Sequence, residues 1–143
     1  MGVTVSDLLS RKDGEVVTIG PEATVLDAVR LMAERDIGSV AVVEAERLVG
    51  MLTERHYARN VMLAGRRSDA TAVREVMSSE LVPVAPNDTV DRCMALMTEH
   101  RIRHLPVLVD DRLAGIVSIG DLVRSRIAEQ EVAIEQLTQY IHS

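Results

Sequence analysis

Two stretches of this chain are variants of one pattern: IGSVAVVEAERLVGMLTERH at residues 37–56 and IRHLPVLVDDRLAGIVSIGD at residues 102–121. Sliding the sequence against itself by 65 residues brings them into register, and Pro21 then falls on Pro86. The register holds without a gap from about residue 17 to residue 57. The chain therefore contains two copies of one unit of about 60 residues.

Each copy repeats the same order of predicted elements. Runs rich in β-branched residues predict strands, at residues 16–19, 40–43 and 48–52 in the first copy and 81–84, 105–109 and 113–117 in the second. After the first strand, apolar residues recur at helical spacing from Val25 and from Val90. A second helix is expected from about Glu54 and from about Gly120. The order is strand, helix, strand, strand, helix.

One such unit cannot bury both faces of its small sheet, whereas two units can do so by packing sheet to sheet around a pseudo-twofold axis. We therefore expect an α/β (α+β) chain of two related units with a long C-terminal helix. The expected boundaries are 5–62 for the first domain, 63–72 for the linker, 73–124 for the second domain and 125–143 for a helical extension.

Composition narrows the function classes. The net charge is −6 and the basic residues are mostly scattered, so we expect neither nucleic acid nor an anionic membrane as a partner. There is no apolar run of about 18 residues and no secretory signal pattern. The single cysteine, Cys93, excludes an internal disulfide and suits a reducing cytoplasm. It falls on an apolar helix stripe, which favours a core residue over a redox role.

Both stretches resemble the CBS domain, and the resemblance covers about residues 5–123. Two copies make the pattern more specific than one. The resemblance implies a Bateman module, in which two domains form two related clefts for adenosyl ligands. AMP is the first candidate, with ATP, ADP or NAD as alternatives, and some members bind S-adenosylmethionine. Such modules usually form dimers, regulate other proteins and do not themselves catalyse.

Ser118, Gly120 and Asp121 stand where the last strand ends and a helix begins. Free N–H groups at a helix N-terminus suit a phosphate, and a Ser hydroxyl adds a hydrogen bond. A carboxylate one turn on can accept both hydroxyls of a ribose, while Gly120 allows close approach. Ser-x-x-Asp is equally a capping box that needs no ligand. The resemblance favours the ligand, because family members use the positions of Ser118 and Asp121 for phosphate or ribose.

The first copy departs from the family pattern at His56. Thr53 matches Ser118, but His56 stands where the pattern has its ribose-binding Asp. An imidazole makes one hydrogen bond to a ribose and cannot bridge both hydroxyls. The Thr53 cleft would therefore bind more weakly, take a different ligand or stand empty. Arg55 beside it either reaches a phosphate or is a solvated surface residue.

The resemblance also implies the remaining walls of each cleft. Residues just before the second strand face ligand phosphates in the family, so Arg103 and His104 are candidates. The adenine slots draw on the opposite domain: Val17 and Ile37 for the Asp121 cleft, Val82 and Ile102 for the Thr53 cleft. His100 and His104 are spaced i, i+4, but His104 is expected on a strand without an acidic or Cys partner. We therefore expect no metal site.

The C-terminal helix carries a heptad pattern. Its apolar positions alternate four and three residues apart, with one polar member, at Val123, Ile127, Gln130, Ile134, Leu137 and Ile141. This seam either folds back on its own domain or meets a second chain. A homodimer is favoured, because a helix this long extends beyond so small a domain.

Two functions remain open. The first is a sensor of energy or redox state that binds a nucleotide and acts on an unidentified regulated protein. The second is a constitutive dimeric adaptor with vestigial clefts, which the His56 departure allows. No Ser-His-Asp or Cys-His arrangement and no paired catalytic carboxylates stand out, so an enzyme is not expected.

Overall fold

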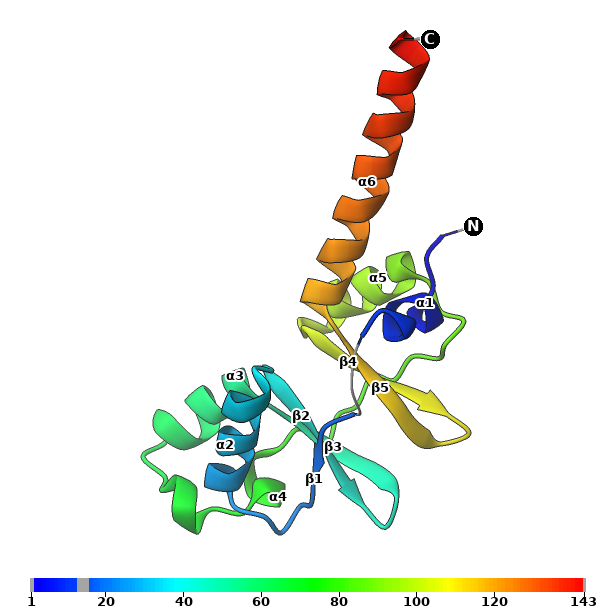
Figure 1. Cartoon of the computed structure of the whole chain (residues 1–143). Helices are drawn as coiled ribbons and strands as arrows, with labels where there is room; N and C mark the ends of the chain where they lie inside the picture. Colours follow the sequence, from blue (N-terminus) through cyan, green and yellow to red (C-terminus); the bar gives the residue numbers. More distant parts are fainter. Residues whose placement is uncertain (1, 13–15, 143) are drawn as a thin grey trace.

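The computed structural model describes residues 2–12 and 16–142. It consists of two α/β units with a long helix projecting from the second (Figure 1). The first unit contains β1 (Thr18–Ile19), α2 (Val25–Arg35), β2 (Ser39–Glu44), β3 (Arg47–Thr53), α3 (Glu54–Tyr57), a π-helical turn (Ala58–Met62) and a 3-10 turn (Ser68–Ala70). The second contains α5 (Val90–His100), β4 (His104–Val109), β5 (Arg112–Ser118) and α6 (Ile119–His142). This is the expected fold class.

The repeat is also visible in the backbone conformation. Both hairpins turn through two residues of positive φ, Ala45 and Glu46 in one copy and Asp110 and Asp111 in the other. Positive φ at both central positions matches the right-handed twist of the flanking strands. The two eleven-residue helices, α2 and α5, end alike, in residues of left-handed conformation that lie one repeat apart, at Asp36 and Arg101. The two copies therefore share turn and cap geometry as well as sequence.

The leading helices are exchanged between the two units. The first, α1 (Val5–Ser10), packs Val5 and Leu8 into the core of the second unit. The other, α4 (Val73–Val76), packs both of its terminal valines into the core of the first unit. Backbone hydrogen bonds repeat this exchange, since the Val5 N–H donates to the Asp88 carbonyl and the Val73 N–H to the Ala23 carbonyl, each at 2.8 Å. Each core is thus completed by a segment distant in sequence.

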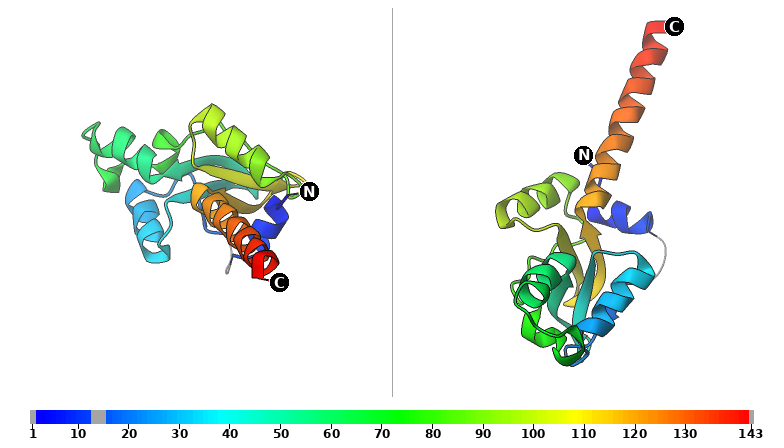
Figure 2. Two further views of the ribbon diagram at one scale, coloured as in Figure 1. Left: turned by 90° about the horizontal axis from the view of Figure 1, so that it is seen from above. Right: turned by 90° about the vertical axis from the view of Figure 1, so that its left-hand side faces the viewer.

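The first strand of each copy is shorter than expected. In the first copy only Thr18–Ile19 pairs, in parallel with Ala41–Val42 of β2. In the second copy the expected strand at residues 81–84 is reduced to one bridge between Val84 and Val107. Pro83 lacks the N–H that a longer ladder would need. The sheets meet along β3 and β5, with helices packed outside them (Figure 2).

The closing helices of the two copies differ most. In the first copy α3 is a single turn followed by the π-helical turn, whereas α6 runs for 24 residues. Figure 1 and the right-hand view of Figure 2 show α6 leaving the body of the molecule. No helix within the described residues is both long and apolar enough to cross a bilayer. The first turn of α6 nevertheless packs in the second unit, where Leu122 is fully buried.

Candidate functional site

A cavity of about 530 Å³ lies between the two units, beside the N-terminus of α6. This volume falls within the range of about 300–1,000 Å³ found for small-molecule sites. Its walls come from both copies and from the segment after α1, and they include Lys12, Val16, Val17, Arg35, Asp36, Ile37, Gly38, Ser39, His104, Ile116, Ser118, Asp121 and Arg124. The cavity therefore exists only when both copies are folded together.

Among the side chains of this cavity, Asp121 makes the most hydrogen bonds. It is 7 % exposed, and its Oδ2 accepts hydrogen bonds from the Ser118 N–H at 2.8 Å and from Lys12 Nζ at 2.9 Å. Its Oδ1 accepts one from Arg124 Nη2 at 2.7 Å. The Ser118 hydroxyl in turn accepts from the Asp121 N–H at 3.3 Å. Ser118 and Asp121 thus form the reciprocal pair of a capping box.

These contacts keep the Asp121 carboxylate ionised. Burial alone would raise the pKa of Asp121, but the Ser118 N–H and the Lys12 ammonium outweigh burial and hold that pKa below its usual value. A carboxylate offers about four lone-pair sites. Three of them already accept hydrogen bonds from Ser118, Lys12 and Arg124, so one is left. Two ribose hydroxyls could therefore both bond to Asp121 only if Lys12 or Arg124 moved away from it.

His104 forms the part of the wall nearest the first unit. A Cβ built on Gly38 would lie 3.7 Å from His104 Nε2, so the ring packs against the Gly38 backbone. Burial and then the charge of Lys12 lower the pKa of His104, against an opposing effect of Asp121. The imidazole is therefore neutral near pH 7, and it can offer one donor and one acceptor to a ligand.

The structure brings together five of the seven residues predicted for this cleft: Val17, Ile37, His104, Ser118 and Asp121. The other two, Arg103 and Gly120, do not line the cavity. The Arg103 side chain is exposed, and its carbonyl accepts a 2.8 Å hydrogen bond from the Ile119 N–H. Gly120 lies close behind the wall, since a Cβ there would meet Arg124 Nη1 at 3.2 Å and Ser118 Oγ at 3.6 Å.

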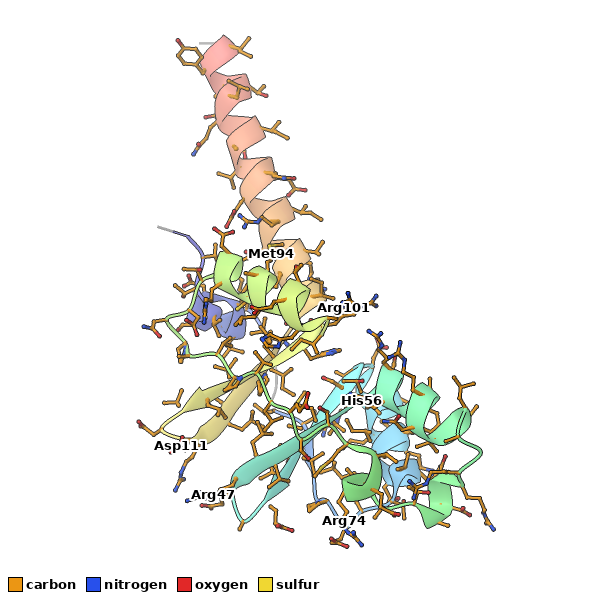
Figure 3. All side chains as sticks on the ribbon, turned by 180° about the vertical axis from the view of Figure 1, so that it is seen from behind. Arg47, His56, Arg74, Met94, Arg101 and Asp111 are labelled. Atoms are coloured by element: carbon orange, nitrogen blue, oxygen red, sulfur yellow. The ribbon has the colours of Figure 1, made fainter. Side chains whose placement is uncertain are left out.

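The residues predicted for the other cleft are not joined in an equivalent cavity. Thr53, Arg55, His56, Val82 and Ile102 line neither the cavity of Asp121 nor the smaller one, of about 420 Å³, between α1 and α6. Both Val82 and Ile102 pack against the core of the second unit. His56 lies near the junction of the two units (Figure 3). Unequal clefts thus remain a prediction.

His56 takes the place of a carboxylate in the helix cap of α3. Its Nδ1 accepts a hydrogen bond from the Thr53 N–H at 3.2 Å, and its own N–H donates to Thr53 Oγ1 at 3.1 Å. Burial, followed by the charges of Arg55 and Arg59, lowers the pKa of His56. The neutral ring therefore carries its proton on Nε2, which leaves a donor and no charge for a ligand.

Among the residues of the Asp121 cavity that sequence analysis missed, five have charged or polar side chains: Lys12, Arg35, Asp36, Ser39 and Arg124. Arg124 stands three positions after Asp121 on a predicted helix, so helical spacing alone could have identified it. Lys12, the only lysine of the chain, is 109 positions from Asp121. Finding it required the exchange of the leading helices, which no local pattern indicates.

Two other predictions concern groups that were not assigned to a cleft. Cys93 is fully buried, and burial raises the pKa of its thiol to about 11, so it remains protonated as a core residue. Across the part of the chain that the structure describes, no cluster of three or more His, Cys, Asp and Glu side chains could hold a metal ion.

The arrangement can hold an anion next to a hydroxylated group. Lys12, Arg35 and Arg124 supply positive charge around the helix N-terminus, and Asp121 supplies a buried acceptor. Val17 and Ile37 supply an apolar surface from the opposite unit. A ligand that carries both a phosphate and a ribose would satisfy the charged and the neutral parts together.

Comparison with known proteins places these features in a family. The model of the CBS domain matches residues 3–62 and 73–128. The CBS domain-containing protein CBSX3 of Arabidopsis thaliana, described as mitochondrial, is 40 % identical, over 96 % of this chain and 71 % of its own length.

Solved structures agree with the sequence matches. A CBS-domain protein of Burkholderia ambifaria MC40-6, ascribed to signal transduction, superimposes with a TM-score of 0.86 at 47 % identity, over 90 % of this chain and 96 % of that one. A CBS-CP12 protein from bloom-forming cyanobacteria, described as hexameric, gives a TM-score of 0.76 at 31 % identity, over 86 % of this chain and 71 % of that one.

Proposed function

The chain belongs to the CBS domain family and contains two CBS domains, and from this premise we propose that it is a regulatory module that binds an adenine nucleotide. CBS-pair proteins are in general regulatory and non-catalytic. The observation that carries the proposal is the buried Asp121 carboxylate at the N-terminus of α6, surrounded by the cations of Lys12 and Arg124.

The proposed binding mode follows from this charge arrangement. The ribose hydroxyls donate to Asp121, and the base lies between Val17 and Ile37. Lys12 or Arg124 leaves the carboxylate and turns to the phosphate, so one ion pair replaces another and little charge is left unpaired. AMP is the first candidate, and ADP, ATP and NAD offer the same ribose and phosphate chemistry. Binding would report the energy or redox state to an unidentified regulated protein.

We also propose that the protein forms a homodimer, acts without catalysis and resides in the cytoplasm. The hexameric CBS-CP12 relative supports self-association in the family. The single, buried Cys93 suits a reducing compartment, although the Arabidopsis relative is described as mitochondrial.

A melting screen against AMP, ADP, ATP, NAD and S-adenosylmethionine tests the proposal. A ligand at a hundred times its dissociation constant stabilises the folded state by about 2.7 kcal/mol. We expect at least one of these compounds to raise the melting temperature by several degrees. If none does so at millimolar concentration, the nucleotide proposal fails. The alternative, a constitutive dimeric adaptor with vestigial clefts, would then be favoured. Asp121 would in that case serve only its hydrogen bonds within the chain, and the neutral His56 would bind no phosphate.

A further inference from the structure

Along most of its length α6 exposes a stripe of apolar side chains with one polar member, Gln130. From Gln130 to Ile141 every side chain of the helix is exposed, and Figures 1 and 2 show this part standing clear of both units. The exposed fractions along the stripe are 44 % at Val123, 49 % at Ile127, 64 % at Ile134, 59 % at Leu137 and 68 % at Ile141. Apolar side chains in one row on a free helix indicate a binding surface.

The spacing of the stripe identifies what would cover it. Its members alternate four and three residues apart, a period of 3.5 that keeps one face of a helix against another helix as the two supercoil. We propose that this stripe is the seam of a parallel, two-stranded coiled coil formed with α6 of a second copy. The inference rests on the proposed homodimer and does not depend on nucleotide binding.

Gln130 gives the first argument for the parallel direction. It is the polar member of the seam, in line with Ile127 and Ile134. In a parallel pair the same residues meet, so the Gln130 amide faces its own copy and each amide can donate to and accept from the other. In the antiparallel pair of greatest overlap, Gln130 faces Ile134 of the second copy. A buried amide without a partner is costly.

The charges beside the seam give the second argument. Glu131 flanks the seam immediately after Gln130. In the antiparallel pair of greatest overlap Glu131 approaches Glu131 of the second copy, and like charges repel. In the parallel pair its neighbour across the interface is Arg126. Within one chain that guanidinium contacts Asp91 and Glu129 and is 36 % exposed, so Glu131 would share it. The parallel direction avoids the repulsion.

The same residues argue against a membrane as the occupant. Beyond Arg126 the helix carries three glutamates, at positions 129, 131 and 135, and neither lysine nor arginine. Anionic lipid surfaces attract basic helices, so this acidic helix would be repelled. A second copy of the chain satisfies both the apolar seam and the charges.

The coil would link the dimer to the candidate cleft. Asp121 lies in the first turn of α6, and Arg124, its ion-pair partner, lies between Val123 and Ile127 in sequence. In a parallel coil the two Asp121 cavities therefore lie at the same end of the assembly, because Asp121 is only two residues before Val123, where the seam begins.

Disulfide trapping in the full chain tests the proposal. In a parallel coil two copies of residue 130 face each other within the Cα separation of about 4.4–6.8 Å that a disulfide needs. Gln130→Cys should therefore give a disulfide-linked dimer as the main oxidised product. Val132→Cys, which lies outside the seam on the same helix, is the matched control and should stay largely unlinked. The native Cys93 is buried and contributes no background.

Light scattering supplies the second readout. The wild type and Val132→Glu should have the mass of two chains, and the double variant Ile134→Glu, Leu137→Glu the mass of one. A dimeric wild type whose Gln130→Cys variant does not link, and whose double variant stays dimeric, would overturn the coil while leaving the dimer intact. Linking only between Gln130→Cys and Ile134→Cys chains would overturn the parallel direction. A monomeric wild type would overturn both the coil and the dimer.

Discussion

The Asp121 carboxylate accepts hydrogen bonds from Ser118, Lys12 and Arg124. These contacts satisfy a buried charge that would otherwise be costly. In the proposed binding mode, Lys12 competes with the ribose for Asp121 and then pairs with the phosphate. A ligand with a ribose but no phosphate would displace Lys12 or Arg124 from Asp121 and supply no anion to pair with the displaced cation.

Lys12→Met should therefore separate AMP from adenosine. We expect AMP affinity to fall by about tenfold, because one charge-assisted hydrogen bond is lost and Lys12 is 41 % exposed. Adenosine affinity should be unchanged or higher, because the variant frees an acceptor site on Asp121. Titration calorimetry with both ligands measures the difference. The matched control is Arg47→Met, the same loss of charge at an exposed position on the β3 hairpin. Equal losses for AMP and adenosine would contradict the exchange of partners.

The two histidines at the junction predict a pH dependence of stability. The pKa values of His56 and His104 lie below the usual 6.5 in the folded chain, chiefly because of burial. As the pH falls through that value, the unfolded chain binds more protons than the folded chain, so the free energy of unfolding decreases. Their contribution is thus fully present above pH 6.5 and is lost below it.

Thermal melts between pH 8 and pH 5.5 check this expectation. The wild type should melt at a lower temperature at the acidic end, and His104→Gln should reduce the difference. His100→Gln, at an exposed position on α5, serves as the control and should melt like the wild type at each pH. A wild-type melting temperature that is constant across this range would exclude a stability cost of protonating the junction histidines.

At the scale of elements, the cores depend on the exchanged leading helices. Leu8 of α1 is 3 % exposed and packs among residues of the second copy, including Val90 and Leu122. Leu8→Ala should lower the free energy of unfolding by about 2–5 kcal/mol, the usual cost of such a truncation in a core. Leu63→Ala, at a residue that is 84 % exposed, should change it little. Denaturant unfolding measures both, and a cost below about 1 kcal/mol for Leu8→Ala would mean that α1 is not part of that core.

Local sequence patterns predicted most helices and strands, but they did not predict that α1 and α4 are exchanged between the two units. Both hairpins and both eleven-residue helices follow from periodicity and turn residues, which act over short distances. Pro83 was part of the expected strand at residues 81–84, and its missing N–H explains why only Val84 pairs. Nothing near α1 in the sequence indicates that it packs on the second copy, because that preference comes from a surface more than 70 residues away.

For the candidate site as well, local sequence patterns predicted some residues, whereas others depend on the tertiary arrangement. Ser118 and Asp121 were predicted from a strand-to-helix junction, together with a family resemblance, and the structure places both on one cavity. Lys12 was missed because only the tertiary arrangement brings it to Asp121. Arg103 was expected to face a ligand, but its side chain is exposed outside the cavity wall.

The whole molecule is a pseudo-twofold pair whose symmetry is broken at the two helix caps. Asp121 and His56 occupy equivalent positions, and both complete a capping box. Only Asp121 has a negative charge and two oxygens for a ribose. A charged acceptor contributes about 1.5–3 kcal/mol against about 0.5–1.5 for a neutral one. The difference of about 1–2 kcal/mol leads us to expect a five- to thirtyfold difference in affinity between the two predicted clefts.

Titration calorimetry with AMP, ADP, ATP and NAD on the wild type, Asp121→Ala, His56→Ala and His56→Asp tests the central claim most directly. We expect one tight site per wild-type chain for at least one nucleotide, its loss in Asp121→Ala and its retention in His56→Ala. His56→Asp should strengthen binding at the weaker cleft and add a second detectable site. Undiminished binding in Asp121→Ala, or equal losses in both alanine variants, would contradict a nucleotide site built on Asp121.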